Sequence, residues 1–257
     1  NLLHRFGLLL VILFVGLALS LLTDTFLSVA NFTNVARQIS INGILAVGVT
    51  FVLLTGGVDL SLGSVVALSG VACATFAHPG DHSVFVPIAV GLLTGAACGL
   101  VNGTLVTLGG VAPFIVTLGM MTIARGLALI FSGGRPVADM SNELTALAGD
   151  LFGIPIPMLC FAGVAAAAWF FLSNFRLGRH IYAVGGNENA ARAAGVPVEQ
   201  VKLFAYGLCG LLAGLAGVVL AARITPASRT RARPTNSTQS RPWSSAARAC
   251  PAGSAAS

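Results

Sequence analysis

Charged side chains are rare in the apolar part of this chain, so the few that occur there are the first candidates for chemistry. Asp59 lies between two apolar runs and Arg125 lies inside another, while the only other charged residue within the runs, Lys202, stands at the margin of the last one. Acid–base or nucleophilic catalysis needs catalytic groups held close together. Two isolated charges give poor support to an intramembrane enzyme, and we expect no catalytic residue.

Metal ligands are equally scattered. Cysteines fall inside apolar runs without C-x-x-C spacing, which is typical of small packing residues: Cys73, Cys98, Cys160 and Cys209. His78 and His82 share a short connector with Asp81, but three potential ligands without a fixed scaffold are more simply explained as a solvated turn. We therefore expect neither a metal site nor a cofactor.

The composition is that of a membrane protein. Hydrophobic residues make up 56% of the 257 residues, charged residues 9%, and the mean hydropathy is +0.89. Helices are favoured over barrel strands, because the apolar runs show no two-residue alternation and a bilayer leaves backbone groups no outside partner. Seven runs approach the roughly 20 residues that a spanning helix needs: Phe6–Leu22, Ile39–Thr55, Leu60–Ala77, Val84–Leu108, Ala112–Phe131, Ile154–Leu172 and Val201–Ala222.

The positions of Lys and Arg predict the orientation. With the amino end in the cytoplasm, five of them lie inside (Arg5, Arg176, Arg179, Arg192 and Lys202) and two lie outside (Arg37 and Arg135). This orientation places residues 174–200 in the cytoplasm and the connectors 78–83 and 132–153 on the far side. The first run also resembles a secretory signal, but its apolar length and the lack of a small-residue cleavage site argue against its removal.

The segment GGVDLSLGS, residues 56–64, separates the second run from the third. It lacks the lysine followed by Ser or Thr that a phosphate-binding loop needs after its last glycine, which argues against nucleotide binding. Asp59 or Ser61 is expected to cap the next helix, and the glycines permit a sharp reversal or a broken helix. Because broken helices at membrane depth line cavities, Asp59, Ser61 and Ser64 are also candidates for the wall of a permeation pathway.

Further lining candidates lie in the fourth and fifth runs. Arg125 costs about 3 kcal/mol or more deep in lipid unless it snorkels or finds a partner. It either lines the pathway or bonds loop carbonyls near an interface. Asn102, Phe114 and Thr117 are weaker candidates, for which helix packing is the simpler explanation.

Glycines recur every three or four residues in two of the runs. In a helix such spacing makes a smooth face along which another backbone approaches closely. The pattern predicts tight helix packing, which fits a transporter or a channel, at two sets of positions: Gly91, Gly95, Gly99 and Gly103, and Gly207, Gly210, Gly214 and Gly217.

Three strings carry a family resemblance: GILAVGVT at 43–50, LTGGVDLSLGS at 54–64 and LGRHIYAVGGN at 177–187. They resemble the permease subunits of bacterial ribose-type ABC sugar importers, and the likeness runs from about Phe26 to Ile224. The resemblance implies an all-α, polytopic fold like that of type II ABC importers in the bacterial inner membrane. It also implies a second permease copy, a separate ABC ATPase subunit and a periplasmic sugar-binding protein that delivers a monosaccharide.

Residues 174–200 are the long charged segment between apolar blocks, which indicates a docking surface for a soluble partner. By similarity, part of this segment matches the short coupling element that fits into a cleft on the ATPase. A plain surface helix is the alternative. The matching residues are Gly186, Asn187, Glu188, Ala190, Ala191, Arg192 and Gly195.

The carboxyl end departs from the family. Residues 225–257 contain five arginines and no acidic residue, and removing these arginines changes the formal net charge from +6 to +1, so the basic balance does not indicate nucleic-acid binding. The segment is either a disordered basic tail or the product of a nucleotide lost near Ala227 or Ser228, because a reading one nucleotide earlier yields a family-like continuation. We thus expect a transmembrane permease domain over 1–224 that is C-terminally incomplete.

Other functions stay open. A branched-chain amino-acid permease shares the fold and the docking loop, and a purely structural membrane subunit or an inactive truncated permease needs no pathway at all. Membrane lipid is a partner under every interpretation.

Overall fold

The protein is almost entirely helical. The structure, a computed structural model, describes residues 2–23, 25–78, 83–135, 140–151 and 153–231. The described elements are α1 (Leu2–Leu22), α2 (Val29–Leu54), α3 (Leu62–Thr75), α4 (Phe85–Thr107), α5 (Pro113–Ser132), α6 (Asn142–Ala146), β1 (Asp150–Leu151), β2 (Ile154–Pro155), α7 (Ile156–Asn174), α8 (Arg176–Gly186), α9 (Glu188–Ala193) and α10 (Val198–Arg231). The strands pair as one short antiparallel hairpin.

Each of the seven predicted apolar runs is a helix, so the predicted all-α membrane architecture is confirmed. Among the described residues, α2, α4, α5, α7 and the Val198–Ile224 part of α10 are long and apolar enough to cross a bilayer. Two apolar helices are shorter, namely residues Leu10–Leu22 of α1 and the whole of α3.

The predicted boundaries of two helices are wrong. Helix α2 begins at Val29, ten residues before the expected Ile39, because the Ser28 side chain caps it by accepting the Asn31 N–H. The polar residues that follow therefore belong to the helix. Helix α10 begins at Val198 and continues to Arg231, beyond both ends of the expected run Val201–Ala222. The hypothesis of an out-of-frame tail stays a prediction, and most of that tail, 232–257, lies outside the described residues.

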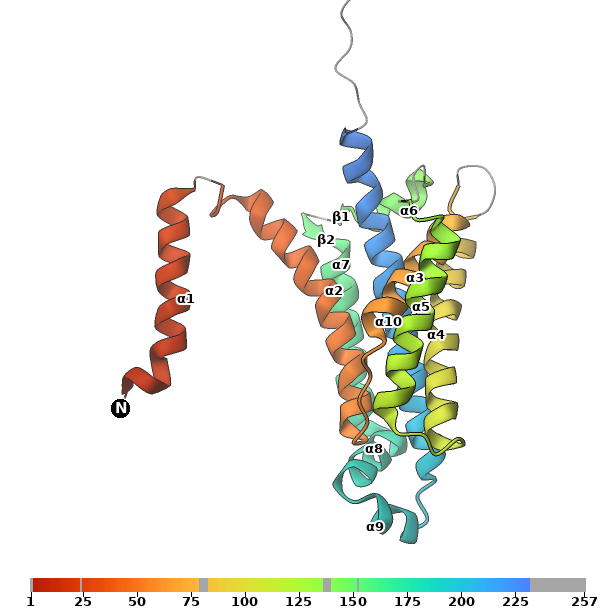
Figure 1. The fold of residues 1–257 in the computed structure, drawn as a ribbon. Helices are drawn as coiled ribbons and strands as arrows, with labels where there is room; N and C mark the ends of the chain where they lie inside the picture. The colour runs from red at the N-terminus through yellow and green to blue at the C-terminus, as the bar shows by residue number, and fades with distance from the viewer. Residues whose placement is uncertain (1, 24, 79–82, 136–139, 152, 232–257) are drawn as a thin grey trace, which may run out of the picture.

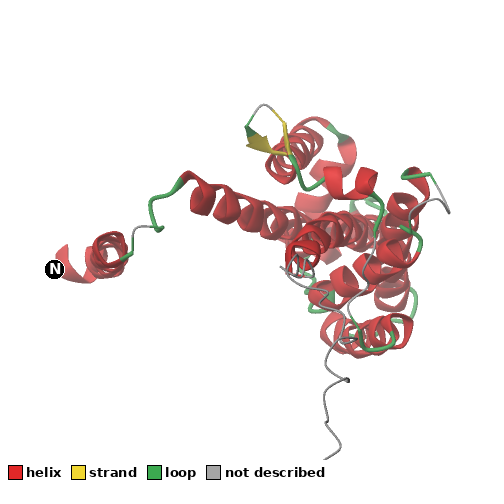
Figure 2. Ribbon diagram, turned by 90° about the horizontal axis from the view of Figure 1, so that it is seen from above, coloured by secondary structure: helices red, strands yellow, loops and turns green. Residues whose placement is uncertain are grey.

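The connectors gather at two opposite ends of the bundle (Figure 1). Helices α8 and α9, the end of α2 and the 108–112 turn lie at one, here called the α9 end. Helix α6 and the hairpin lie at the other, the hairpin end. Helix α1 stands apart from the other helices in both views (Figures 1 and 2). The described parts of the two connectors that the charge pattern places outside thus lie at the end opposite the predicted cytoplasmic segment.

Helix α10 occupies the centre of the bundle, against α4, α3 and α2. Its glycines meet those of α4 backbone to backbone: a Cβ added at Gly99 would lie 2.9 Å from Gly210 Cα, and one at Gly95 would lie 2.6 Å from Gly214 Cα. The predicted packing role of these glycines is confirmed. Gly217 instead lies against α3, beside Ser69.

Polar contacts fasten the hairpin end. Arg37 on α2 pairs with Asp150 of β1 at 2.7 Å, and Arg223 on α10 donates a hydrogen bond to Gln38 of α2 at 2.7 Å. These contacts join α2 to the hairpin and to α10 at the end opposite α9.

Replacing Gly99 by alanine should push α4 and α10 apart, because the new methyl group would overlap the backbone of α10. Overpacking of this kind costs about 1–3 kcal/mol, so thermal unfolding in detergent should occur several degrees lower. Gly163 on α7 is the matched control, since a Cβ there has open space around it. Equal midpoints for Gly99→Ala and Gly163→Ala would contradict the packing role.

Candidate functional site

A break separates α2 from α3 inside the bundle. Helix α2 ends at Leu54, Gly56 takes a left-handed φ of 76°, and the chain runs without helical structure until α3 begins at Leu62. Figure 1 shows this segment returning from the α9 end and entering α3 partway along the bundle. A Cβ at Gly57 would lie 2.6 Å from the Tyr206 hydroxyl, so the segment passes close to α10. Of the two expected geometries, a sharp reversal or a broken helix, the chain shows a reversal at Gly56 followed by a non-helical segment that leads into α3.

Buried polar side chains hold this break in place. Asp59 Oδ1 accepts hydrogen bonds from the Ser61 backbone N–H at 2.9 Å and from the Ser61 hydroxyl at 2.6 Å. Asn102 on α4 donates from Nδ2 to Ser61 Oγ at 3.0 Å. The exposed fractions are 8% for Asp59, 0% for Ser61 and 1% for Asn102. These three residues, the buried polar cluster, attach the break to α4.

Helix α10 closes the other side of the cluster. The Tyr206 hydroxyl donates to the Val58 carbonyl at 3.4 Å, and the Cys209 thiol lies beside Asp59. Asn102 Oδ1 is buried without a hydrogen-bond partner among the described residues. The sequence predicts that Asp59 or Ser61 caps α3. Asp59 accepts the backbone N–H of Ser61, the residue at the N-cap position, whereas the Ser61 side chain makes no capping bond because its hydroxyl contacts Asp59 and Asn102.

The remaining lining candidates separate into two groups. Ser64 and Thr117 are buried, and the Thr117 hydroxyl bonds the Pro113 carbonyl of its own helix at 2.9 Å. Phe114 and Arg125 are exposed on the outward side of α5. The structure thus brings Asp59, Ser61 and Asn102 together but places Phe114 and Arg125 on a different surface.

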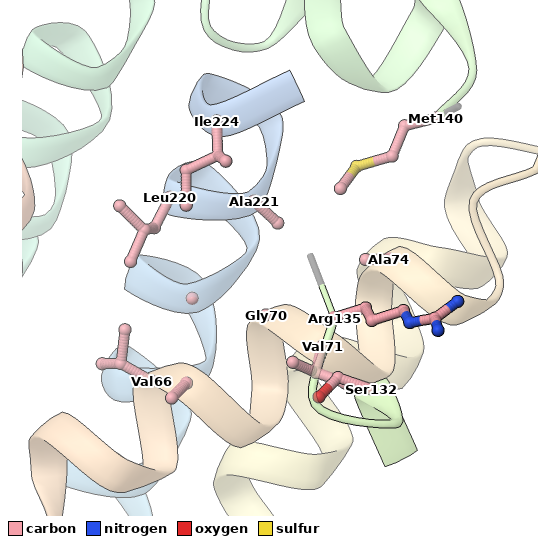
Figure 3. Close-up of a pocket in the computed structure, with 12 residues that line it drawn as sticks. Val66, Gly70, Val71, Ala74, Ser132, Arg135, Met140, Leu220, Ala221 and Ile224 are labelled. Atoms are coloured by element: carbon pink, nitrogen blue, oxygen red, sulfur yellow. The ribbon is translucent and has the colours of Figure 1, made fainter. Parts of the chain in front are cut away.

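An apolar cavity of about 280 Å³ lies nearer the hairpin end, between α3, the end of α5 and α10 (Figure 3). Carbon-rich side chains such as Val66, Val71 and Leu220 line most of it, and Ser132 and Arg135 supply polar atoms. None of the predicted lining residues borders this cavity. Its walls offer few hydrogen-bonding groups for a solute rich in hydroxyls.

Helix α9 is a short helix whose ends are both capped. Asn187 accepts the Ala190 N–H at 3.0 Å as the N-cap. At the other end Gly195 has a φ of 80°, the Val196 N–H bonds the Ala191 carbonyl at 3.0 Å, and the Gly195 N–H bonds the Arg192 carbonyl at 3.1 Å. This pattern is a Schellman motif. Gly195 therefore ends α9.

Ion pairs join α9 to the start of α10. Glu188 pairs with Lys202 at 2.7 Å and with Arg192 at 3.4 Å, while Arg192 also pairs with Glu199. The hydrogen bond from Lys202, followed by the attraction of both cations, lowers the pKa of Glu188 below its ordinary value. The four residues form one charge network around α9.

An apolar cluster anchors α8 and α9 to the spans. Ala191, Ile181 and Val184 are buried together with Phe51 of α2 and Val201 of α10. A Cβ at Gly185 would collide with the Leu54 carbonyl, so α8 lies directly against the end of α2. Because α9 is held by this contact and by the charge network, it is coupled to α2 and α10 as one packed unit.

The predicted coupling residues divide by exposure. Gly186, Asn187, Ala190, Arg192 and Gly195 are exposed, whereas Glu188 is half-buried and Ala191 is buried. The first group forms an accessible surface at the α9 end. The other two hold that surface in position, a distinction that the sequence pattern alone does not make.

Comparison with known proteins gives a family match over most of the chain. The family described as "Branched-chain amino acid transport system / permease component" matches residues 31–239. The chain belongs to this permease family. It is therefore a multi-pass protein of the bacterial cytoplasmic membrane and a transport subunit. The family match reaches fifteen residues past Ile224, farther than the resemblance seen in the sequence.

Individual relatives of this permease carry the names of sugar transporters. The chain is 42% identical over 216 residues to the ribose import permease protein RbsC of Escherichia coli K12, covering 82% of this chain and 67% of RbsC. It is 38% identical to the D-allose permease AlsC of the same strain, covering 80% and 63%. Identity to the L-arabinose permease AraH of Azospirillum brasilense is 40%, covering 88% and 66%. No solved structure matches the chain.

Replacing Lys202 by methionine should loosen α9, because Glu188 loses its shortest ion pair. Exposed or partly exposed pairs contribute up to about 1 kcal/mol, so amide hydrogen exchange over 190–194 should be about two- to fivefold faster. Gln200→Met, an exposed neighbour outside the charge network, should leave exchange unchanged.

The protection of α9 in the parent protein should depend on pH. It should hold at neutral pH and fall as the pH drops through the lowered pKa of Glu188, because a carboxylate whose pKa is lowered by its partners stabilises the fold only while it is ionised.

Replacing Ser61 by alanine should destabilise the bundle, because Asp59 and Asn102 lose their shared buried partner. Unsatisfied buried polar groups cost about 1–3 kcal/mol each, which should lower the thermal midpoint clearly. Thr122→Ala is the control, since that hydroxyl bonds only its own helix on the exposed side. A Ser61→Ala midpoint as high as that of the control would show that the buried polar cluster does not stabilise the fold.

Proposed function

We propose that this permease is the membrane-spanning subunit of an ATP-driven importer that carries a monosaccharide across the bacterial cytoplasmic membrane. The main support is the α9 end, where a capped helix with an exposed surface is packed onto α2 and α10. The sugar assignment is supported by the names of the ribose, allose and arabinose permeases among its relatives.

The proposed energy source is a separate ABC ATPase that binds the exposed residues of α9. Because α9 is attached through Ala191 and through the pair of Glu188 with Lys202, a displacement of α9 moves the start of α10 with it. Helix α10 contacts α2, α3 and α4, so the movement reaches both sides of the α2–α3 break. A rigid-body displacement of this kind is a common way of transmitting a conformational change.

The break is the proposed wall of the pathway. Asp59, Ser61 and Asn102 supply polar groups within the bundle. Ser64 on α3 and Thr117 on α5 are buried as well. Phe114 and Arg125 line the pathway only where another chain segment or a second permease copy covers the outward side of α5. The chain spans about two thirds of RbsC, which leaves room for such a segment in a longer protein.

The proposed partners occupy opposite ends. The ATPase binds the α9 end, and a periplasmic sugar-binding protein delivers its ligand to the hairpin end, formed by α6 and the β1–β2 hairpin. A second permease copy completes the pathway. Arg37 and Arg223 stiffen the hairpin end through their contacts with Asp150 and Gln38.

A branched-chain amino acid is the second candidate substrate. The family description favours it, because that description names branched-chain amino-acid transport. The relatives with the printed identities favour a sugar. Competition between pentoses or hexoses and leucine, isoleucine or valine for uptake separates the two.

Reconstitution with the cognate ATPase and binding protein should yield ATP hydrolysis that a sugar stimulates severalfold. Ala190→Asp, which puts a charge on the exposed surface of α9, should abolish the stimulation. Gln200→Ala, at the same end but on α10, should not. Both the chain as written and a version with the family-like reading frame restored should be assayed. If no pentose or hexose stimulates the restored version, the sugar assignment fails.

A further inference from the structure

Two arginines at the α9 end are left without a carboxylate. Residues 174–202 contain four Lys and Arg residues and two acidic ones. Both acids are engaged by Arg192 and Lys202. Arg176 and Arg179 are exposed on α8 and have no ion pair among the described residues. The whole net positive charge of this segment therefore belongs to these two side chains.

Arg176 and Arg179 share one face of α8. They are three residues apart, so they are neighbours on the helix surface. The buried residues of α8, Gly178, Ile181 and Val184, lie on the opposite face and pack onto the spans. We call the exposed pair the α8 basic face. It begins two residues after α7 ends at Asn174 and is therefore at the margin of a predicted membrane span.

Exposed aromatic and aliphatic side chains lie before and after the α8 basic face along the chain. Trp169 and Phe170 on the last turns of α7 are 71% and 53% exposed, and the Phe170 ring meets the Phe175 ring edge-on at 6.0 Å. Leu177 and Tyr182 on α8 are also exposed. Water does not favour such a surface, whereas aromatic belts mixed with Arg are typical of the boundary between acyl chains and headgroups.

Helix α7 leaves this boundary open to lipid. Only 6% of its apolar window is buried, and α2 covers it along one side. Helix α9 lies on the far side of α8 from the spans (Figure 1), so it does not separate the start of α8 from the end of α7. The exposed end of α7 and the α8 basic face thus meet at one place on the edge of the bundle.

We propose that the α8 basic face binds the headgroups of anionic phospholipids in the inner leaflet, with Arg176 and Arg179 each contacting phosphate. The guanidinium group suits this ligand, because its planar fork donates two hydrogen bonds to phosphate oxygens. Trp169, Phe170 and Phe175 pack against the acyl chains of the same lipids, next to the headgroups. The proposal rests on the α9 end lying at a membrane surface, as proposed above, and not on which molecule is transported.

Tryptophan quenching tests the proposal on the full chain. The sequence has two tryptophans, and Trp243→Phe leaves Trp169 as the only reporter. The protein is placed in vesicles of equal parts phosphatidylglycerol and phosphatidylcholine, with brominated acyl chains on one lipid or on the other. Bromine quenches only in contact, so the ratio of the two signals gives the preference of this edge for the anionic lipid.

Brominated phosphatidylglycerol should quench Trp169 more strongly than brominated phosphatidylcholine. Each basic residue near an anionic surface changes binding by about fivefold, so Arg176→Gln and Arg179→Gln should each reduce the preference by about that factor. The double lysine variant, Arg176→Lys with Arg179→Lys, should keep most of it, and high salt should weaken it. Arg135→Gln, at the hairpin end, is the matched control.

Three outcomes would overturn the proposal. Equal quenching by both lipids in the parent would show that the edge has no headgroup preference. An unchanged ratio in the Arg176→Gln and Arg179→Gln variants, together with weaker binding of the ATPase, would assign these arginines to the ATPase instead. Weak quenching by both brominated lipids would show that protein, such as a second permease copy, covers the α8 basic face. None of these outcomes depends on sugar-stimulated ATP hydrolysis, so the importer assignment is tested separately.

Discussion

The close approach of α4 and α10 is the constraint on which the rest of this permease depends. Gly95 and Gly99 meet Gly210 and Gly214 without side chains between them, so the central helix is held at backbone contact distance. In lipid no hydrophobic force drives helices together, and such contacts must come from close packing. Once α10 is fixed there, Tyr206 and Cys209 are placed beside the α2–α3 break and Lys202 beside α9.

Helix α10 therefore connects two regions that differ in kind. Around Asp59 the polar groups are buried and bonded to each other, which gives one defined arrangement of the break. Around α9 the charges are exposed and the ion pairs are individually weak, while the apolar cluster beneath them supplies the attachment. One helix thus joins an exposed charged surface to a buried polar core.

The sequence predicted the helices and their packing faces well, because both follow from local patterns. Long apolar runs and glycines at four-residue spacing need no knowledge of the fold. The early start of α2 was missed, since Ser28 caps a polar first turn that a hydropathy pattern does not include. The capping role expected of Ser61 failed for another reason. Its hydroxyl oxygen accepts a hydrogen bond from Asn102, forty-one positions away, and no local sequence pattern predicts such a contact.

The candidate site was predictable in part. Asp59, Ser61 and Asn102 were chosen as rare polar groups in apolar surroundings, and burial brings them together. Arg125 was chosen by the same rule but lies on the outward side of α5, as does the weaker candidate Phe114, because which face of a helix is covered depends on its neighbours. The family resemblance located the α9 segment, yet only the structure distinguishes the buried Ala191 from its exposed neighbours.

The short length of α3 has a wider consequence. Its 14 residues rise only about 21 Å, less than the roughly 30 Å of a hydrocarbon core, so the unwound residues before it must complete the crossing. Residues 58–60 take no part in a helical hydrogen-bond ladder. This crossing is a composite of helix and extended chain, and it carries main-chain donors and acceptors into the interior of the bilayer. Side chains must therefore satisfy main-chain groups that an unbroken helix would bond internally, as Asp59 does for the Ser61 N–H and Tyr206 does for the Val58 carbonyl.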